Sequence, residues 1–231
     1  MNHVYSFMSN ITVIDGGPRR GMNTAAMVAA FEEGAKEVGA RVQTFRLYDI
    51  DYKGCRSCLV CKLKNRKTDV CAYRDGLTEA LSAATWADGV VLASPVYFGR
   101  VTGQLECFVE RLVFPWLSYD DHSLTPPKRI PWAVIYTMND TRDNLRGLRS
   151  LELLVGGFYG DRPEKVVAFN TYQVKDYDRY AMAAHPKDEK ELWRAEHWQQ
   201  DLAAAKALGN WLASDDLSTY ERQIDHSRPT S

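Results

Sequence analysis

The stretch Trp86–Arg111 reads WADGVVLASPVYFGRVTGQLECFVER and contains a strand, a loop and a helix in direct succession. Its apolar run Gly89–Ser94 is short and continuous, as expected for a strand that is buried on both faces of a sheet. Pro95 fixes the direction of the chain at the end of this run. Beyond it, apolar residues recur at helical spacing: Val101, Leu105, Phe108, Val109 and Leu112. The segment therefore predicts one strand–helix unit of a parallel sheet.

The same alternation of strand and helix continues along the rest of the chain. Strands are expected at residues 11–15, 42–47, 89–94, 132–138 and 165–169. Helices are expected at residues 23–38, 77–86, 101–112, 145–158 and 188–212. The predicted fold class is α/β, a doubly wound five-stranded parallel sheet of order 2-1-3-4-5 with helices on both faces. We expect residues 1–214 to form a single domain and residues 215–231 to form a polar C-terminal tail.

The bulk composition argues against several classes of protein. The chain has 231 residues, of which 45% are hydrophobic, and this is enough for a core. Its 29 basic and 30 acidic residues give a net charge of -1, so nucleic acid is not an expected partner. No apolar run approaches the ~20 residues of a membrane span. The N-terminus does not resemble a signal peptide and the cysteine count is odd, so we expect a cytoplasmic protein.

In a sheet of this order the ligand lies beyond the carboxyl ends of the strands, near the first and third. The first such loop, Gly16–Thr24, reads GGPRRGMNT and leads into a helix N-terminus, where unpaired amides and the helix dipole favour a phosphate. Arg19 and Arg20 add positive charge, and Asn23 and Thr24 can donate hydrogen bonds. The loop matches neither a Walker A nor a dinucleotide fingerprint. It predicts a monophosphate site, and the alternative is a glycine turn with two solvated arginines.

The loop after the third strand, Ser94–Gly99, reads SPVYFG. Tyr97 and Phe98 follow the strand end and lie where the ligand crevice is expected. A tricyclic flavin needs a flat apolar wall together with backbone donors for its polar edge, and this loop offers both. The alternative is a pair of core aromatic residues at a tight turn.

Taken together, these motifs resemble the NADPH-dependent FMN reductase and iron–sulfur flavoprotein group of the flavodoxin-like superfamily. The resemblance covers most of residues 10–212. Its matching pieces are GGPRRGMNTAAM (16–27), the cysteine-rich stretch (55–71), YRDGLTEAL (73–81), the stretch quoted above (86–111) and FNTYQVKDYDRY (169–180). The resemblance implies a flavodoxin-like fold and noncovalently bound FMN.

The resemblance also implies roles for individual positions. Contacts with FMN are expected from a phosphate loop, from the SPVYFG loop along the isoalloxazine, and from the loop after the fourth strand. These residues are Gly17, Pro18, Arg19, Asn23, Thr24, Ser94, Pro95, Val96, Tyr97, Phe98, Gly99, Thr137 and Asn139. The chain departs from the family at Gly17, where a serine is usual, and at Met22, where a glycine is usual. No side chain is required as a catalytic nucleophile, acid or base.

Four cysteines lie close together in the sequence: Cys55, Cys58, Cys61 and Cys71. Their spacing resembles the compact motif of the iron–sulfur flavoproteins, although the last gap is wider than in the family. Four thiolates can hold a [4Fe–4S] cluster, and zinc or free thiols are the alternatives. The fifth, Cys107, is expected to be a small core residue.

The function expected from these observations is that of an FMN-dependent oxidoreductase. Its electron donor would be NAD(P)H or a reduced electron carrier, and its acceptor a small molecule such as a flavin, a quinone or a nitro or azo compound. One alternative is an electron carrier with an iron–sulfur cluster, and another is a flavin-free sensor or binding module. We also expect a homodimer or homotetramer, with the cysteine loop or the proline-rich loop 114–129 at the interface. Trp116 and Tyr119 are candidates for covering the flavin or meeting a partner subunit.

Overall fold

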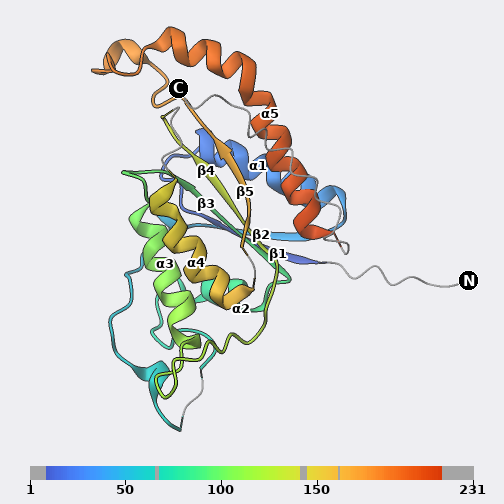
Figure 1. Cartoon of the computed structure of the whole chain (residues 1–231), viewed down its shortest axis with the longest axis vertical. Helices are drawn as coiled ribbons and strands as arrows, with labels where there is room; N and C mark the ends of the chain where they lie inside the picture. The colour runs from blue at the N-terminus through green and yellow to red at the C-terminus, as the bar shows by residue number, and fades with distance from the viewer. Residues whose placement is uncertain (1–8, 66–67, 141–144, 161, 215–231) are drawn as a thin grey trace, which may run out of the picture.

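A computed structural model describes residues 9–65, 68–140, 145–160 and 162–214. Its five strands form one parallel sheet of order β2-β1-β3-β4-β5, which confirms the predicted topology (Figure 1). The strands are β1 (Asn10–Asp15), β2 (Arg41–Arg46), β3 (Gly89–Pro95), β4 (Trp132–Thr137) and β5 (Glu164–Ala168). β3 and β4 are buried along their whole length, which is why they read as continuous apolar runs. The edge strand β2 is partly exposed.

In the described residues, five α-helices cover the two faces of the sheet. They are α1 (Asn23–Glu37), α2 (Thr78–Trp86), α3 (Gly103–Val113), α4 (Arg149–Tyr159) and α5 (Lys187–Ala213). α1 and α5 pack on one face, and α2, α3 and α4 pack on the other (Figure 1). Each layer buries its own apolar cluster against the sheet. Within the described residues, no helix has both the length and the apolar character that a membrane span needs.

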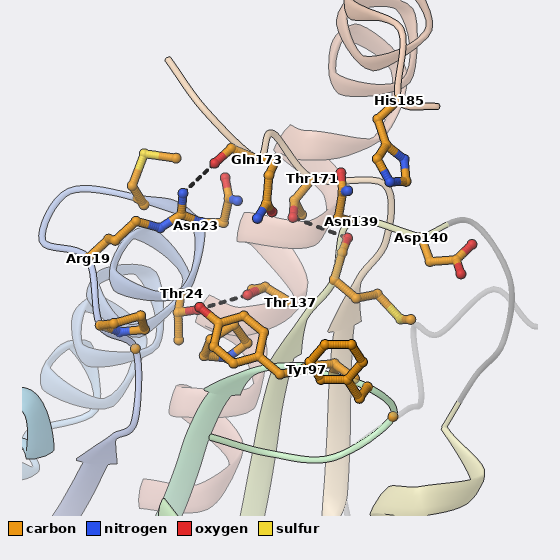
Figure 2. Close-up of a pocket in the computed structure, with 18 residues that line it drawn as sticks. Arg19, Asn23, Thr24, Tyr97, Thr137, Asn139, Asp140, Thr171, Gln173 and His185 are labelled. Carbon is orange, nitrogen blue, oxygen red and sulfur yellow. Dashed lines mark hydrogen bonds between the residues drawn. The ribbon is translucent and has the colours of Figure 1, made fainter. Parts of the chain in front are cut away.

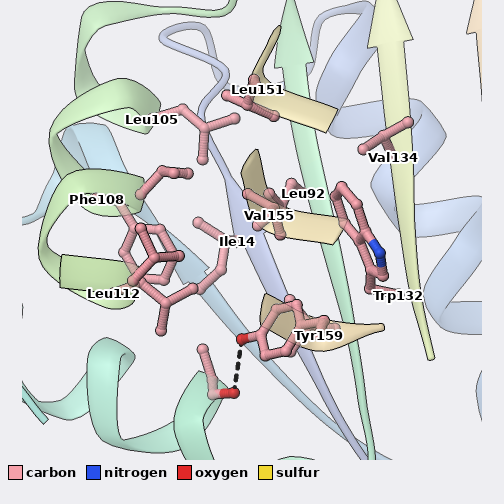
Figure 3. Packing of buried hydrophobic residues seen from close by; sticks show 14 of the residues in the cluster. Ile14, Leu92, Leu105, Phe108, Leu112, Trp132, Val134, Leu151, Val155 and Tyr159 are labelled. Carbon is pink, nitrogen blue, oxygen red and sulfur yellow. Dashed lines mark hydrogen bonds between the residues drawn. The ribbon is translucent and has the colours of Figure 1, made fainter. Parts of the chain in front are cut away.

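The larger cluster holds the α2–α3–α4 layer on the sheet (Figure 3). Ile14, Leu92 and Val134 of the three central strands meet the apolar sides of α3 and α4. Tyr159 at the end of α4 is fully buried, and its hydroxyl donates a hydrogen bond of 2.9 Å to the carbonyl of Ala84 in α2. This bond satisfies the polar end of a core tyrosine and joins two of the three helices.

The proline-rich loop after α3 is more ordered than its composition suggests. Trp116 lies in a short helical turn, Phe114–Trp116, and packs on Phe158 and Tyr159, with ring centroids 5.9 and 5.6 Å away. Its indole N–H donates to the carbonyl of Asp69 at 2.7 Å. The prediction that Trp116 covers the ligand or meets a partner is therefore wrong, because this side chain belongs to the core.

Cys107 also differs from its prediction. It is partly exposed and lies against Gly54, where an added Cβ would be 3.1 Å from its Sγ. It therefore stands at the border between α3 and the cysteine-rich segment, outside the core.

Candidate functional site

A pocket of about 410 Å³ opens at the carboxyl ends of the central strands, a volume typical of small-ligand sites (Figure 2). Loops after β1, β3, β4 and β5 form its walls. All the predicted FMN contacts except Ser94 line it: Gly17, Pro18, Arg19, Asn23, Thr24, Pro95, Val96, Tyr97, Phe98, Gly99, Thr137 and Asn139. Met138, within the predicted loop after β4, also lines the pocket, and residues that were not predicted complete the lining: Met22, Asp140, Thr171, Gln173 and His185.

Asp15, the last residue of β1, stabilises the loop that follows this strand. This buried carboxylate accepts hydrogen bonds from the amide of Gly17 at 2.7 Å and from Nη1 of Arg46 at 2.6 Å. Burial raises the pKa of Asp15, and the Gly17 amide and Arg46 oppose that rise. A Cβ on Gly17 would lie 2.9 Å from Oδ1 of Asp15. A side chain at position 17 would therefore collide with this carboxylate.

The N-terminus of α1 faces the same pocket. The preceding residue, Met22, makes no capping hydrogen bond, and the first turn of the helix contains no acidic residue. Its N-terminal amides therefore have no side-chain acceptor from the cap position, and the positive end of the helix dipole is not offset locally. Thr24 lies one residue into the helix, with its Oγ1 2.8 Å from Oγ1 of Thr137 at the end of β4. This end of the pocket is suited to an anion.

The two arginines of this loop behave differently. Arg19 lines the pocket, and its Nη1 donates to the carbonyl of Gln173 in the segment after β5. Arg20 is turned away and forms an exposed ion pair with Asp49, 2.8 Å between Nη2 and Oδ2. Both arginines were expected to add charge to this loop, but only Arg19 brings its charge to the pocket lining. Asn23 also reaches the segment after β5, through a 2.7 Å hydrogen bond from its Nδ2 to the carbonyl of Tyr172.

The loop after β3 forms a tight turn at the opposite wall. The amide of Tyr97 donates to the carbonyl of Arg100 at 2.8 Å, and the reverse bond is 3.0 Å long. The two central residues, Phe98 and Gly99, have φ values of +53° and +75°. A phenylalanine rarely adopts this left-handed conformation, and the side chain of Phe98 is fully exposed at the pocket. Strain together with an exposed aromatic ring is typical of a ligand-binding turn.

Ser94 lies beneath this turn and is completely buried. Its hydroxyl donates to the carbonyl of Pro95 at 2.7 Å and accepts from the amide of Thr102 at 3.0 Å. Ser94 thus joins the two ends of the turn and does not itself line the pocket.

The remaining wall comes from the ends of β4 and β5. The amide of Thr171 donates to the carbonyl of Met138 at 2.9 Å, and the amide of Asn170 donates to that of Asp140 at 3.0 Å. These bonds carry the segment after β5 across the pocket and bring Thr171, Gln173 and His185 to its edge (Figure 2). The stretch FNTYQVKDYDRY contains two of these three, and it was the signal from which they could have been found.

The pocket has the two ends that FMN requires. One end offers helix amides, Arg19, Asn23 and Thr24 to a phosphate, and the other offers the aromatic turn at Tyr97 to a planar ring. The Oδ1 atom of Asn139 is buried at the wall and has no hydrogen-bond partner among the described residues. It is an acceptor that an N–H group of a bound ring can satisfy. The residues present therefore fit FMN.

A second, smaller pocket is lined by the four clustered cysteines, together with Tyr73 and Arg111. Arg111 has a completely buried side chain, and it binds Asp75 at 2.6 Å and the carbonyls of Lys53 and Tyr73 at 3.0 and 2.8 Å. These bonds anchor both ends of the cysteine-rich segment to α3. All five cysteines are free, and burial raises the pKa of Cys61. In the part of the chain that the structure describes, no group of three or more His, Cys, Asp or Glu side chains is placed to hold a metal ion.

The sheet order and the position of the pocket define a flavodoxin-like protein. Residues 9–136 match the family described as NADPH-dependent FMN reductase, and because this is more than half of the chain, the protein belongs to that family. The match ends with β4, so the segment after β5 and the whole of α5 lie outside it.

Curated relatives include an iron–sulfur flavoprotein of Methanosarcina thermophila. It is 34% identical over 103 residues, which are 45% of this chain and 52% of that protein. An iron–sulfur flavoprotein of Methanocaldococcus jannaschii is 38% identical over 76 residues, 33% of this chain and 37% of the relative. The chain thus matches about half the length, or less, of these relatives.

Solved structures share the fold at low identity. An NAD(P)H:quinone oxidoreductase from Methanothermobacter marburgensis aligns with a TM-score of 0.63 and 14% identity, over 88% of this chain and 98% of that one. An FMN-dependent NADH-azoreductase from Bacillus anthracis, in complex with FMN, aligns with a TM-score of 0.60 and 14% identity, over 89% and 100%. At this level of identity the comparison establishes the fold.

Proposed function

We propose that this protein binds one FMN in the pocket at the ends of β1, β3 and β4 and uses it as an NAD(P)H-dependent oxidoreductase. The observation that supports this most is the pairing of an uncapped α1 N-terminus with an exposed aromatic turn in one cavity. Membership of the NADPH-dependent FMN reductase family agrees with it. The acceptor is proposed to be a small molecule such as a flavin, a quinone or a nitro or azo compound.

Each wall of the pocket has a proposed task. Gly17, Pro18, Arg19, Asn23 and Thr24 bind the phosphate, and the run from Pro95 to Gly99 lies along the isoalloxazine. Thr137 and Asn139 approach the other edge of the ring, and Ser94 supports the turn from below. Bound FMN supplies the hydride and electron transfer. The side chains of this protein bind and orient the cofactor and control access to it, and none is required as an acid or base.

The phosphate loop gives the sharpest test of FMN binding. FMN should bind at least tenfold more tightly than riboflavin, because a charge-assisted hydrogen bond contributes ~1.5–3 kcal/mol. Arg19→Ala should remove much of this preference. Arg20→Ala is the matched control, since Arg20 carries the same charge one residue away but is paired with Asp49 outside the pocket. Equal affinities of the unaltered protein for FMN and riboflavin would contradict the proposal.

Turnover separates an enzyme from the alternatives. Steady oxidation of NAD(P)H in the presence of a quinone or a nitro compound should require FMN. If FMN binds but no nicotinamide donor is oxidised, the protein is an electron carrier. If the purified protein is colourless and does not bind added FMN, it is a sensor or binding module.

A second, narrower proposal is that the four clustered cysteines hold a [4Fe–4S] cluster. Two observations favour it: the four side chains line one pocket, and curated relatives are named iron–sulfur flavoproteins. Against it, the described thiols are not arranged as a metal site, so no electron-transfer step is assigned to a cluster. Iron and sulfide analysis of anaerobically purified protein, with Cys71→Ser as the comparison, decides between a cluster and free thiols. Zinc would appear in the same metal analysis.

We also propose that residues 1–214 act as one domain and that the protein assembles as a homodimer or homotetramer. The support is a group of exposed apolar side chains on the cysteine-rich segment and on the loop after α3.

A further inference from the structure

Lys190 is a lysine buried next to the pocket. It lies in the first turn of α5, and only 2% of its surface is exposed. Its Nζ donates a 2.6 Å hydrogen bond to the carbonyl of Asn139 and a second bond to Oδ1 of Asn170. Lysine is almost never buried to this degree unless it is paired, because removing the ammonium from water is costly. The two hydrogen bonds supply the pairing that a lysine buried to this degree requires.

The two partners of Lys190 belong to the two loops that close one side of the pocket. Asn139 follows β4 and lines the pocket. Asn170 follows β5, has a left-handed backbone with φ of +47°, and donates its amide to the carbonyl of Asp140. The ammonium thus joins the β4 and β5 loops directly behind the wall that Asn139 forms. Lys190 itself does not line the pocket.

Among the described residues, two carboxylates act on the charge of Lys190. Burial lowers its pKa to about 8, while Asp140 from the β4 loop and Glu189 from the same helix favour the charged form. At neutral pH most of the population therefore carries a positive charge behind Asn139. Lys190 lies in α5, which is outside residues 9–136 that match the family model.

We propose that Lys190 is a positioning residue that fixes the Asn139 wall and holds a positive charge behind it, which makes bound FMN easier to reduce. The inference rests on the proposed binding of FMN. Transfer of a hydride from NAD(P)H delivers two electrons and one proton, so it leaves the isoalloxazine with one additional negative charge and releases NAD(P)⁺. A nearby cation in a medium of low dielectric constant stabilises that added charge, and charges close to the ring are a known means of tuning a flavin.

The test compares the affinity of the protein for oxidised and for reduced FMN. Lys190→Met keeps the length of the side chain but removes the charge. We expect the preference for reduced FMN to fall about tenfold, which for a two-electron couple is a midpoint about 30 mV more negative. Lys187→Met is the matched control, because this lysine is in the same turn of α5 but is exposed and pairs with Glu191 at 3.6 Å. Its midpoint should equal that of the unaltered protein.

A purely structural lysine predicts a different result. Lys190→Met would then weaken the binding of oxidised and of reduced FMN by the same factor, so the midpoint potential would not change. An unchanged midpoint would overturn the inference. If this variant does not fold, Asn170→Asp replaces it, since a carboxylate of the same shape neutralises the ammonium and should lower the midpoint in the same direction. An unchanged midpoint in Asn170→Asp also counts against the proposal. If the unaltered protein binds no FMN, the proposed function fails and this inference fails with it.

Discussion

Tyr97 is the residue whose role in the pocket can be separated most cleanly from a role in packing. Its side chain is 39% exposed and lines the pocket in the turn after β3. Tyr97→Ala should weaken FMN binding several-fold, because aromatic stacking contributes ~0.5–1.5 kcal/mol beyond burial. FMN titration gives the affinity, and thermal unfolding of the apoprotein reports on the fold. Trp86→Ala, which alters another exposed aromatic residue, at the end of α2 and outside the pocket lining, should change neither quantity.

The opposite result is equally well defined. If Tyr97 is a packing residue, Tyr97→Ala lowers the melting temperature of the apoprotein by several degrees and leaves the FMN affinity unchanged. That outcome would remove Tyr97 from the proposed site.

Gly17 should tolerate no side chain. A Cβ at this position would lie 2.9 Å from Oδ1 of Asp15 and 3.1 Å from Cβ of Thr24, which are both buried. Gly17→Ala should therefore destabilise the protein by ~1–3 kcal/mol, as overpacking does, and distort the loop that is proposed to bind phosphate. Urea unfolding measures the loss. Gly103→Ala is the control, because an added Cβ there has no neighbour within 4 Å, and stability equal to that control would contradict the explanation.

At the scale of single residues, the sequence predicted the pocket walls after β1, β3 and β4 better than the wall formed by the segment after β5. The residues after β1, β3 and β4 that line the pocket could be predicted because their motifs directly follow strand ends. Ser94 was misplaced because neighbouring residues at a strand end point to opposite sides. Arg20 was misjudged because its partner, Asp49, is distant in the sequence. The path of the segment after β5 brings His185 to the pocket and Lys190 behind its wall, and no periodic pattern reveals this path.

At the scale of secondary-structure elements, the crossing of α1 and α5 depends on two glycines. A Cβ on Gly209 of α5 would lie 2.0 Å from the carbonyl oxygen of Phe31, and one on Gly34 of α1 would lie 1.9 Å from that of Lys206. Backbone atoms cannot move aside as a flexible side chain can. The two helices therefore approach each other closely because neither carries a side chain at the point of contact.

Gly209→Ala should force these helices apart. We expect a loss of about 3 kcal/mol in the free energy of unfolding, at the upper end of overpacking effects, measured by urea denaturation. Gly157→Ala is the comparison, since the nearest atom to its added Cβ is a leucine methyl at 3.2 Å and alanine favours the helix by up to ~1 kcal/mol. Equal stabilities of the two variants would show that the close approach is not what holds α5 in place.

The five strands and five helices could be predicted because each repeats one simple pattern, either a short apolar run or an apolar face. The loop after α3 could not. Its prolines indicate irregular structure, yet Trp116 within it is a core residue packed on Phe158 and Tyr159. An aromatic residue in a loop has no periodicity to show which way it points, so only the tertiary contacts reveal that this loop closes the end of the α3–α4 layer.

At the scale of the whole molecule, two connected segments carry four of the exposed large apolar side chains. Leu59 and Leu63 lie in the cysteine-rich segment, and Tyr119 and Leu124 lie in the loop after α3. The segments are tied together by Lys62, whose Nζ donates to the carbonyls of Phe114 and Leu117. Single exposed apolar residues are ordinary, but a group of them on two joined loops is typical of an interaction surface.

We therefore expect this surface to hold two copies of the chain together. Light scattering at micromolar concentration, with FMN present, should give a mass of at least twice the 26.2 kDa of one chain. Leu63→Glu should shift the mass towards that of a single chain, because a charge placed in an apolar interface loses its hydration without gaining a partner. Leu192→Glu is the control, since Leu192 is 71% exposed on α5, away from both loops. A single-chain mass for the unaltered protein would contradict the proposed assembly. If Leu63→Glu keeps the assembled mass, the interface lies elsewhere on the molecule.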